Sequence, residues 1–154
     1  MELIHRKAQI EDLPALVSLL ADDELGQTRE LINSSTTQLY ADAFHKINND
    51  PNQYLMVLCS KETIIGTCHL TLMHSLTFTG STRLQIEAVR IHSDYRGQNI
   101  GQKMIELAIN WGKEHDAQIF QLTTNKQRVE ALKFYEKLGF KATHEGLKLS
   151  IKSR

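Results

Sequence analysis

The sequence is poor in cysteine, proline and tryptophan, and its charges of opposite sign cancel. Its 154 residues include two cysteines, two prolines and one tryptophan. Two thiols are too few for a disulfide framework, and Cys59 and Cys68 both lie in apolar segments, so we expect buried free cysteines. No run of about 18 apolar residues is present, so we expect no membrane-spanning helix.

The balance of charges also limits the classes of partner that we expect the protein to bind. Eighteen lysines and arginines match eighteen aspartates and glutamates. Proteins that bind nucleic acid or anionic membranes usually present a basic surface, so we predict neither partner. Residues 1–6 lack the long apolar core of a secretory signal, and a cytoplasmic location is expected. The length is typical of one globular domain, and no linker or repeat divides it, so residues 1–154 are predicted to form a single domain.

Hydrophobic periodicity in the first two thirds predicts two helices followed by strands. Residues 3–8 alternate as a strand, and residues 13–20 have helical spacing with Asp12 as a candidate cap. A second helical pattern runs from Leu39 to Ile47, before Asp50-Pro51-Asn52 ends it. The pattern then changes: residues 54–59 are a nearly continuous apolar run, residues 63–72 are rich in β-branched residues, and residues 83–91 alternate. This predicts three antiparallel strands.

The last third alternates between the two types of element. Residues 100–111 form a strongly amphipathic helical pattern, and residues 118–123 a short strand. A further helix at 131–138 is stopped by Gly139, and Leu147, Leu149 and Ile151 alternate as a last strand. The predicted fold class is α/β with a mixed sheet, helices on both faces and the order β-α-α-β-β-β-α-β-α-β.

The segment from Val89 to Gly101 carries the clearest chemical signal. A strand ends, a turn containing Gly97 follows, and a long helix begins. The first N–H groups of a helix have no partner within it and lie at the positive end of its dipole, so they suit a phosphate. Gly101 allows a ligand near the first turn, and Arg96 adds a cation. By itself, such a turn is weak evidence for phosphate binding, because an ordinary connection with a solvated arginine has the same pattern.

Two motifs resemble those of the GNAT superfamily of acetyl-CoA-dependent N-acetyltransferases. The residues Tyr95-Arg96-Gly97-Gln98-Asn99-Ile100-Gly101 are similar to its pyrophosphate loop, Q/R-x-x-G-x-G/A. The segment from Ala131 to Phe140 is similar to its A-x-x-F-Y-x-x-x-G-F pattern. Asn99 replaces the middle glycine, and asparagine is the next best residue for a positive φ, so we expect the loop to survive. Arg128 stands where many members have an asparagine that touches pantetheine.

The resemblance implies acetyl-CoA as cosubstrate and a GNAT-type fold. It implies that pantetheine pairs with the strand around Val89 and Ile91, and that pyrophosphate lies on the amides of the loop. The cofactor-binding residues implied in this way are Val89, Arg90, Ile91, Arg96, Gly97, Gln98, Asn99, Ile100, Gly101 and Gln102, with Arg128 a candidate for a CoA phosphate.

Two catalytic residues follow from the same resemblance. Tyr135 matches the tyrosine that often protonates the CoA sulfur, although its spacing alone fits a core aromatic. Glu87, two residues before Val89, matches a catalytic or water-positioning glutamate, although a solvated strand carboxylate has the same pattern. The seven histidines and two cysteines show no metal-binding spacing, so no metal is predicted. A histidine remains an alternative base, with His92 and His74 nearest in sequence.

We therefore expect an N-acetyltransferase that acts on the primary amine of a small acceptor. A protein or peptide N-acetyltransferase and a non-catalytic acyl-CoA sensor are the alternatives, and a homodimer is left open. An acidic excess between Ala21 and Asp50 favours a cationic acceptor, unless these acids only cap helices and solubilise a loop. The acids in question are Asp22, Asp23, Glu24, Glu30, Asp42 and Asp50.

Overall fold

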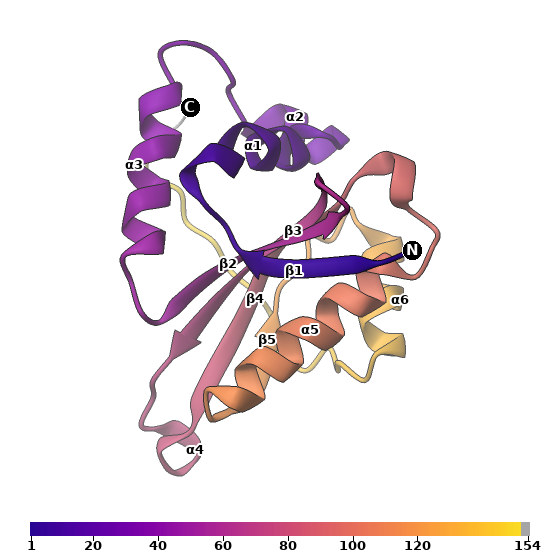
Figure 1. Ribbon diagram of the computed structural model, residues 1–154. Coiled ribbons are helices and arrows are strands. Elements are labelled where there is room, and N and C mark those ends of the chain that lie inside the picture. Colours follow the sequence, from indigo (N-terminus) through magenta and orange to yellow (C-terminus); the bar gives the residue numbers. More distant parts are fainter. Residues whose placement is uncertain (152–154) are drawn as a thin grey trace. The chain divides into compact units, whose positions relative to one another are not determined.

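The structure, a computed structural model, describes residues 1–151 apart from the side chain of Glu24. Figure 1 shows helices on both faces of a twisted sheet in the first part of the chain. The elements before residue 82 are β1 (Leu3–Lys7), a 3-10 turn (Ile10–Asp12), α1 (Leu13–Ala21), α2 (Glu24–Arg29), α3 (Thr37–Asn48), β2 (Gln53–Ser60), β3 (Thr63–Met73) and the short α4 (Thr77–Gly80). The later ones are β4 (Thr82–Ile91), a second 3-10 turn (Ser93–Tyr95), α5 (Ile100–Glu114), β5 (Ala117–Leu122) and α6 (Val129–Lys137).

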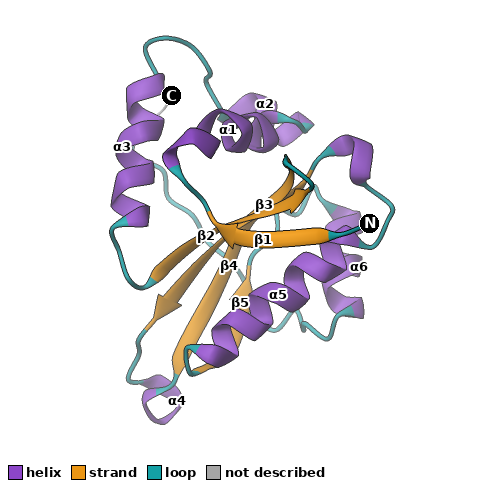
Figure 2. Cartoon of the chain, in the orientation of Figure 1, coloured by secondary structure: helices purple, strands orange, loops and turns teal. Residues whose placement is uncertain are grey.

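The chain divides into two compact units, Met1–Gln121 and a second that begins at Leu122. The first contains a five-stranded sheet in the order β1-β2-β3-β4-β5 (Figure 2). Strands β1 to β4 pair antiparallel with their neighbours, as predicted for β2, β3 and β4. The mixed α/β architecture predicted from the sequence is confirmed in this unit.

One face of the sheet is apolar and packs on α5. Met56, Leu70 and Leu84 point to this face and are completely buried, as is Met104 of α5. A Cβ at Gly112 of α5 would lie 2.5 Å from the Phe120 ring and 3.0 Å from Leu84, so helix and sheet are in close contact there. The alternation of buried and half-buried residues in β4 follows from the two-residue period of a strand.

On the other face, α1 packs on β3 and β4, and α3 packs on β2. Leu16 of α1, Phe44 of α3 and Val57 of β2 form one buried cluster with Ala8 and Cys59. Cys59 and Cys68 are both free and buried, as expected, and burial raises the pKa of the Cys68 thiol to about 12. No helix among residues 1–151 is long and apolar enough to cross a membrane.

The second unit is built around α6. The Tyr135 ring packs edge-on against Phe134 and Phe140, with centroid distances of 5.1 and 6.0 Å. Gly139 has a φ of 100°, a left-handed conformation that glycine adopts easily, and it follows the end of the helix as predicted.

Two local predictions are wrong, and one short helix was missed. Leu147, Leu149 and Ile151 are 92%, 87% and 84% exposed and form no strand, because alternation makes a strand only where a neighbouring strand supplies hydrogen bonds. The segment between the predicted helices contains an additional short helix, α2. The Asp12 side chain does not cap α1.

Asp12 instead joins β1 to the turn that precedes α1. Its two carboxylate oxygens accept hydrogen bonds of 2.7 and 3.1 Å from the Arg6 guanidinium, and one of them accepts the Gln9 N–H at 2.8 Å. The hydrogen bond from Arg6 is the main reason that the pKa of Asp12 lies below its ordinary value, and the Gln9 amide acts in the same direction. Because Asp12 is buried, this bidentate pair is shielded from much of the solvent.

We predict that Asp12→Asn lowers the free energy of unfolding by about 1–3 kcal/mol at pH 7, because a charge-assisted pair is lost. The folded-state pKa of Asp12 is depressed, so its stabilising effect is present above the unfolded-state pKa and is lost as pH falls through the folded-state pKa. The difference between parent and variant should therefore shrink below about pH 4. Urea unfolding at several pH values measures this, with exposed Glu114→Gln as the control. A difference that does not change with pH would contradict the assignment.

Candidate active site

Strand β4 contains a bulge at Ala88 and Val89, where the residues predicted to pair with pantetheine begin. Thr67 pairs with Arg90 and His69 pairs with Glu87, so Ala88 and Val89 together lie opposite Cys68 alone. Ala88 has a φ of 52°, in the left-handed region that non-glycine residues rarely occupy. A bulge interrupts the ladder and redirects the strand, and such bulges are frequent beside active sites. The bulge therefore separates the regular part of β4 from its last residues, Arg90 and Ile91.

Before the bulge, β3 and β4 present a polar face on the side opposite α5. Cross-strand partners share a face, so Glu87 lies beside His69 and Gln85 beside Thr71. Gln121 of β5 extends this row, since its amide donates to the Gln85 side-chain oxygen at 2.8 Å. Glu87 is exposed, whereas His69, Gln85 and Gln121 are half-buried. We call this set, which consists of Gln53, His69, Thr71, Gln85, Glu87 and Gln121, the polar sheet face.

His69 was missed by the sequence prediction, which favoured His92 and His74. It becomes part of the polar sheet face only through the pairing of β3 with β4, which brings it beside Glu87. Its Nε2 lies 2.7 Å from the Gln53 side-chain oxygen. Burial lowers the pKa of His69, and the nearby Glu87 carboxylate partly opposes this shift. By contrast, the His92 ring accepts the Asp94 N–H at 3.1 Å, and the His74 ring lies 3.2 Å from the Thr82 hydroxyl.

The loop between β4 and α5 has the backbone geometry predicted for it. Gly97 has a φ of 77°, and Asn99 is the N-cap of α5 with φ 61° and ψ 18°. The expectation that Asn99 adopts the conformation of the missing glycine is confirmed. The first backbone bond into the helix runs from Lys103 N–H to the Asn99 carbonyl at 3.2 Å. The amides of Ile100, Gly101 and Gln102 precede it, at the N-terminal end of a 15-residue helix.

Arg96 is held beside this loop from two directions. Its Nε donates to the Ile91 carbonyl at 3.2 Å, and one terminal nitrogen lies 3.5 Å from an Asp22 carboxylate oxygen at the end of α1. Both side chains are exposed, so the ion pair is weak, and Arg96 can turn from Asp22 to an anion on the loop.

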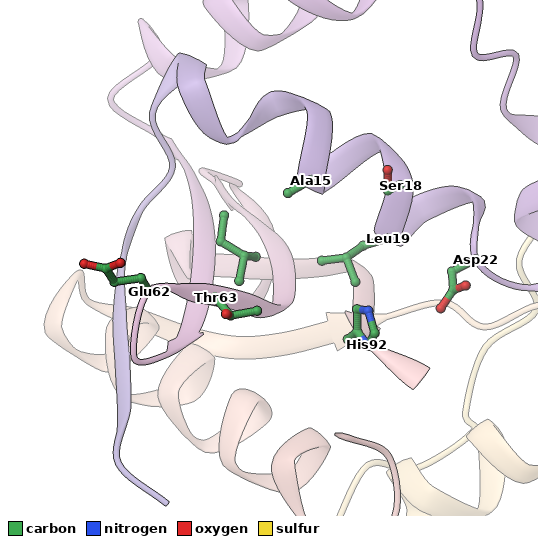
Figure 3. Close-up of a pocket in the computed structure, with 8 residues that line it drawn as sticks. Ala15, Ser18, Leu19, Asp22, Glu62, Thr63 and His92 are labelled. Atoms are coloured by element: carbon green, nitrogen blue, oxygen red, sulfur yellow. The ribbon is translucent and has the colours of Figure 1, made fainter. Parts of the chain in front are cut away.

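A pocket of about 410 Å³ lies between α1, the start of β3 and the residue after β4 (Figure 3). Leu19 and Asp22 line it from the end of α1, Glu62 from the β2–β3 turn, Thr63 from the start of β3, and His92 from just after β4. None of the lining residues belongs to the polar sheet face. The lining contains two carboxylates and, apart from His92, no group that can carry a positive charge, so the pocket is a poor phosphate site.

Five of the six acids between Ala21 and Asp50 are held by local contacts, and the side chain of Glu24 lies outside the described residues. The Asp23 side chain accepts the Gly26 N–H and so caps α2, while Glu30 accepts the Tyr40 hydroxyl and Asp42 accepts the Gln38 amide. Asp22 pairs with Arg96, and Asp50 accepts hydrogen bonds from Asn52 and Gln53. These contacts favour the interpretation that the acids cap and solubilise local structure.

Tyr135 and Arg128 belong to the second unit and are described within it. Tyr135 is half-buried in α6, and Arg128 is the N-cap residue of that helix, with its N–H bonded to the Asn125 carbonyl at 2.8 Å. Within residues 1–151, no three histidine, cysteine, aspartate or glutamate side chains are grouped so that they can hold a metal ion.

The sequence profile of the acetyltransferase (GNAT) family matches residues 15–140, which include the bulged strand, the loop and α6. The chain belongs to the GNAT acetyltransferase family. GNAT enzymes use acetyl-CoA as the acetyl donor, and this chain is an acetyl-CoA-dependent N-acetyltransferase by family. The fold, with its mixed five-stranded sheet, agrees with that membership.

Known proteins similar to this GNAT chain differ in their described roles. An aminoalkylphosphonate N-acetyltransferase from Salmonella typhimurium is 25% identical over 142 residues, which cover 90% of this chain and 85% of that protein. A crystal structure of a transcriptional regulator from Bacillus halodurans is 45% identical, with a TM-score of 0.93, and the match covers 97% of this chain and 100% of that one. A predicted acetyltransferase from Clostridium acetobutylicum, solved with acetyl-CoA, has 21% identity and a TM-score of 0.75, with 97% of each chain covered.

The bulge at Ala88 leads to a stability prediction. Ala88→Gly should leave the free energy of unfolding within about 1 kcal/mol of the parent, because glycine tolerates a positive φ but is more flexible when unfolded. Ala88→Val should lower it by roughly 1–3 kcal/mol, since a β-branched side chain is strained in this conformation. Urea unfolding of both variants measures the contrast. Equal stability of the glycine and valine variants would contradict a left-handed Ala88.

Proposed function

We propose that this GNAT enzyme transfers the acetyl group of acetyl-CoA to the primary amine of a small acceptor by direct attack on the thioester. The main support for the proposal is a set of four successive backbone features between β4 and α5. They are a bulge at Ala88, a left-handed Gly97, a left-handed Asn99 and a long helix. Helix amides at such a loop bind phosphate oxygens. A bulge leaves its extra residue out of the ladder, so the backbone groups of that residue are available for an amide-containing ligand.

In this proposal, the pyrophosphate of CoA is bound by the amides of residues 97 to 102, with Arg96 as a cation beside them. The pantetheine arm pairs with backbone around Val89, Arg90 and Ile91. Arg128, in the second unit, is the candidate for a further CoA phosphate. The electrostatic attraction is local, which is consistent with a chain of zero net charge.

The chemistry requires removal of one proton before attack and delivery of one proton after it. The acceptor ammonium loses a proton near Glu87, and the neutral amine then attacks the thioester carbon to form a C–N bond. The C–S bond breaks as the tetrahedral intermediate collapses, and Tyr135 donates a proton to the CoA thiolate. A second proton leaves the new amide nitrogen and restores the Tyr135 hydroxyl, and the proton taken from the ammonium passes to water, which returns the site to its starting state.

The similarity to an aminoalkylphosphonate N-acetyltransferase supports a small amine as acceptor. It does not favour a cationic over a zwitterionic acceptor, because an aminoalkylphosphonate carries a negative group. Five of the six acids of residues 21–50 are bonded locally, so they give no separate argument for a cation. The similarity to a transcriptional regulator supports a second candidate, a GNAT-fold protein that binds acyl-CoA without turnover.

The decisive experiment is release of free CoA from acetyl-CoA with a panel of amines. The panel contains a polyamine, an aminoglycoside, an aminoalkylphosphonate, a neutral amine and a lysine-containing peptide. Turnover of a small amine well above the background hydrolysis supports the proposal, and turnover of the peptide alone supports a peptide N-acetyltransferase. Tight acetyl-CoA binding by calorimetry without turnover of any amine would favour the sensor.

We predict that Gly101→Glu abolishes acetyl-CoA binding, because it adds a carboxylate to the first turn of α5 where the phosphates are proposed to bind. Asn110→Glu is the matched control. It adds the same charge at an exposed position of the same helix, about 14 Å further along its axis. Calorimetry should show binding retained in the control. Unchanged binding in Gly101→Glu would remove the loop from the cofactor site.

We also predict that Tyr135→Phe lowers kcat by roughly 10²–10⁴-fold with little change in acetyl-CoA affinity, because only the proton donor is lost. Phenylalanine keeps the ring contacts with Phe134 and Phe140, so the melting temperature should stay close to that of the parent. Steady-state kinetics and thermal unfolding of the same preparation measure both effects. Full activity of the phenylalanine variant would leave Tyr135 with a packing role only.

A further inference from the structure

A chain of three hydrogen-bonded side chains crosses from β2 to β3 and ends beside Glu87. The Gln53 amide nitrogen donates to an Asp50 carboxylate oxygen at 2.9 Å, and the Gln53 oxygen lies 2.7 Å from Nε2 of His69. On the next strand, Glu87 is the direct cross-strand partner of His69. The sequence separates these four residues by up to 37 positions, so only the sheet brings them together.

These hydrogen bonds determine which nitrogen of His69 carries the proton. A carboxylate only accepts hydrogen bonds, so the NH₂ group of Gln53 must be the one that faces Asp50. The Gln53 oxygen therefore faces His69 and accepts from an Nε2–H. In the neutral ring, this leaves Nδ1 with a lone pair and no proton, which is the state required of a base.

We propose that His69 accepts the proton of the acceptor ammonium at Nδ1, with Gln53 and Asp50 holding its tautomer and Glu87 stabilising the imidazolium that forms. This inference rests on the proposed function and names the proton acceptor of that same site. The N–H bond of the ammonium breaks and an Nδ1–H bond forms, which leaves a neutral amine for attack on the thioester. The proton passes to water after the step.

The surroundings of His69 match this role. Its half-buried position disfavours the charged ring at rest, and the Glu87 carboxylate favours it once the proton arrives. The other side chains of the polar sheet face on β3, β4 and β5 are the neutral Thr71, Gln85 and Gln121. Charged residues nearby are Arg83, on the same face of β4 four residues from Glu87, and Asp50, behind Gln53. Helix α3, which packs on β2, carries the titratable residues Asp42, His45 and Lys46. Asp22, at the end of α1, forms an ion pair with Arg96.

One test moves a carboxylate next to His69 without changing the net charge. In the double variant Asp50→Asn with Gln53→Glu, the new amide at position 50 can donate to the new carboxylate at position 53, which accepts from His69 Nε2. A negative charge at hydrogen-bond distance should raise the pKa of His69 by about 1–3 units. The pKa that defines the acidic limb of the pH profile of kcat/KM should rise as well. The increase should equal the increase in the His69 pKa measured by NMR of the imidazole nitrogens. A structural His69 would shift in NMR and leave the limb in place, which would overturn the proposal.

Deletion variants complete the test. His69→Gln should remove the acidic limb and lower kcat/KM by roughly 10²–10⁴-fold, with acetyl-CoA affinity retained. Glu87→Gln should keep a limb but move it to lower pH, because the stabilising charge is gone; complete loss of the limb would assign the base to Glu87 instead. His5→Gln, at an exposed position of β1, is the matched control and should leave the profile unchanged.

Two further outcomes separate this inference from the function on which it rests. Failure of the parent protein to release CoA with any amine would overturn the proposed function and, with it, the role of His69. A parent that turns over normally, with an NMR spectrum showing neutral His69 protonated at Nδ1, would overturn the role of His69 alone. An Nε2–H tautomer, with a His69 pKa equal to that of the acidic limb, supports the proposal.

Discussion

Strand β4 contributes one face to the packed core and the other to the proposed active site. This is possible because successive side chains of a strand point to opposite faces. Leu84 and Ile86 are buried against the α5 side, while Gln85 and Glu87 point to the opposite side. Placing the polar residues on the core face would bury groups without partners, at a cost of several kcal/mol. The core therefore fixes the register, and the register in turn fixes which polar side chains of β3 and β4 become neighbours.

Backbone conformation, more than side-chain chemistry, prepares the proposed cofactor site. Ala88 and Asn99 are non-glycine residues in the left-handed region, one at the bulge and the other at the start of α5. Such conformations persist only where the surrounding structure holds them, here the β3–β4 ladder on one side and the buried Ile100 and Met104 on the other. The same elements that stabilise the fold thus shape the turn between strand and helix.

The polar side chains of the first unit are organised by hydrogen bonds that composition does not reveal. Six acids between residues 21 and 50 suggested a field that attracts cations. In the structure, Asp23 caps a helix, Asp22 balances Arg96, and Asp50 orients the Gln53 amide. A carboxylate that is committed to local donors contributes less to long-range attraction than its formal charge implies. The same local bonding gives Gln53 a defined orientation toward His69.

The sequence by itself determined the mixed α/β class, the order of most elements, the two buried thiols and the left-handed Asn99, because these depend on local periodicity and on the φ preferences of single residues. It also contained the two motifs that resemble the GNAT family. It did not reveal α2, it wrongly predicted a strand at 147–151, and it singled out His92 and His74. Whether an alternating segment becomes a strand depends on a partner, and exposed Leu147 and Leu149 have no ladder in the described chain. The pairing of His69 with Glu87 was decided only by tertiary structure, because the β3–β4 register, with its bulge at Ala88, depends on how the whole sheet packs its apolar face against α5.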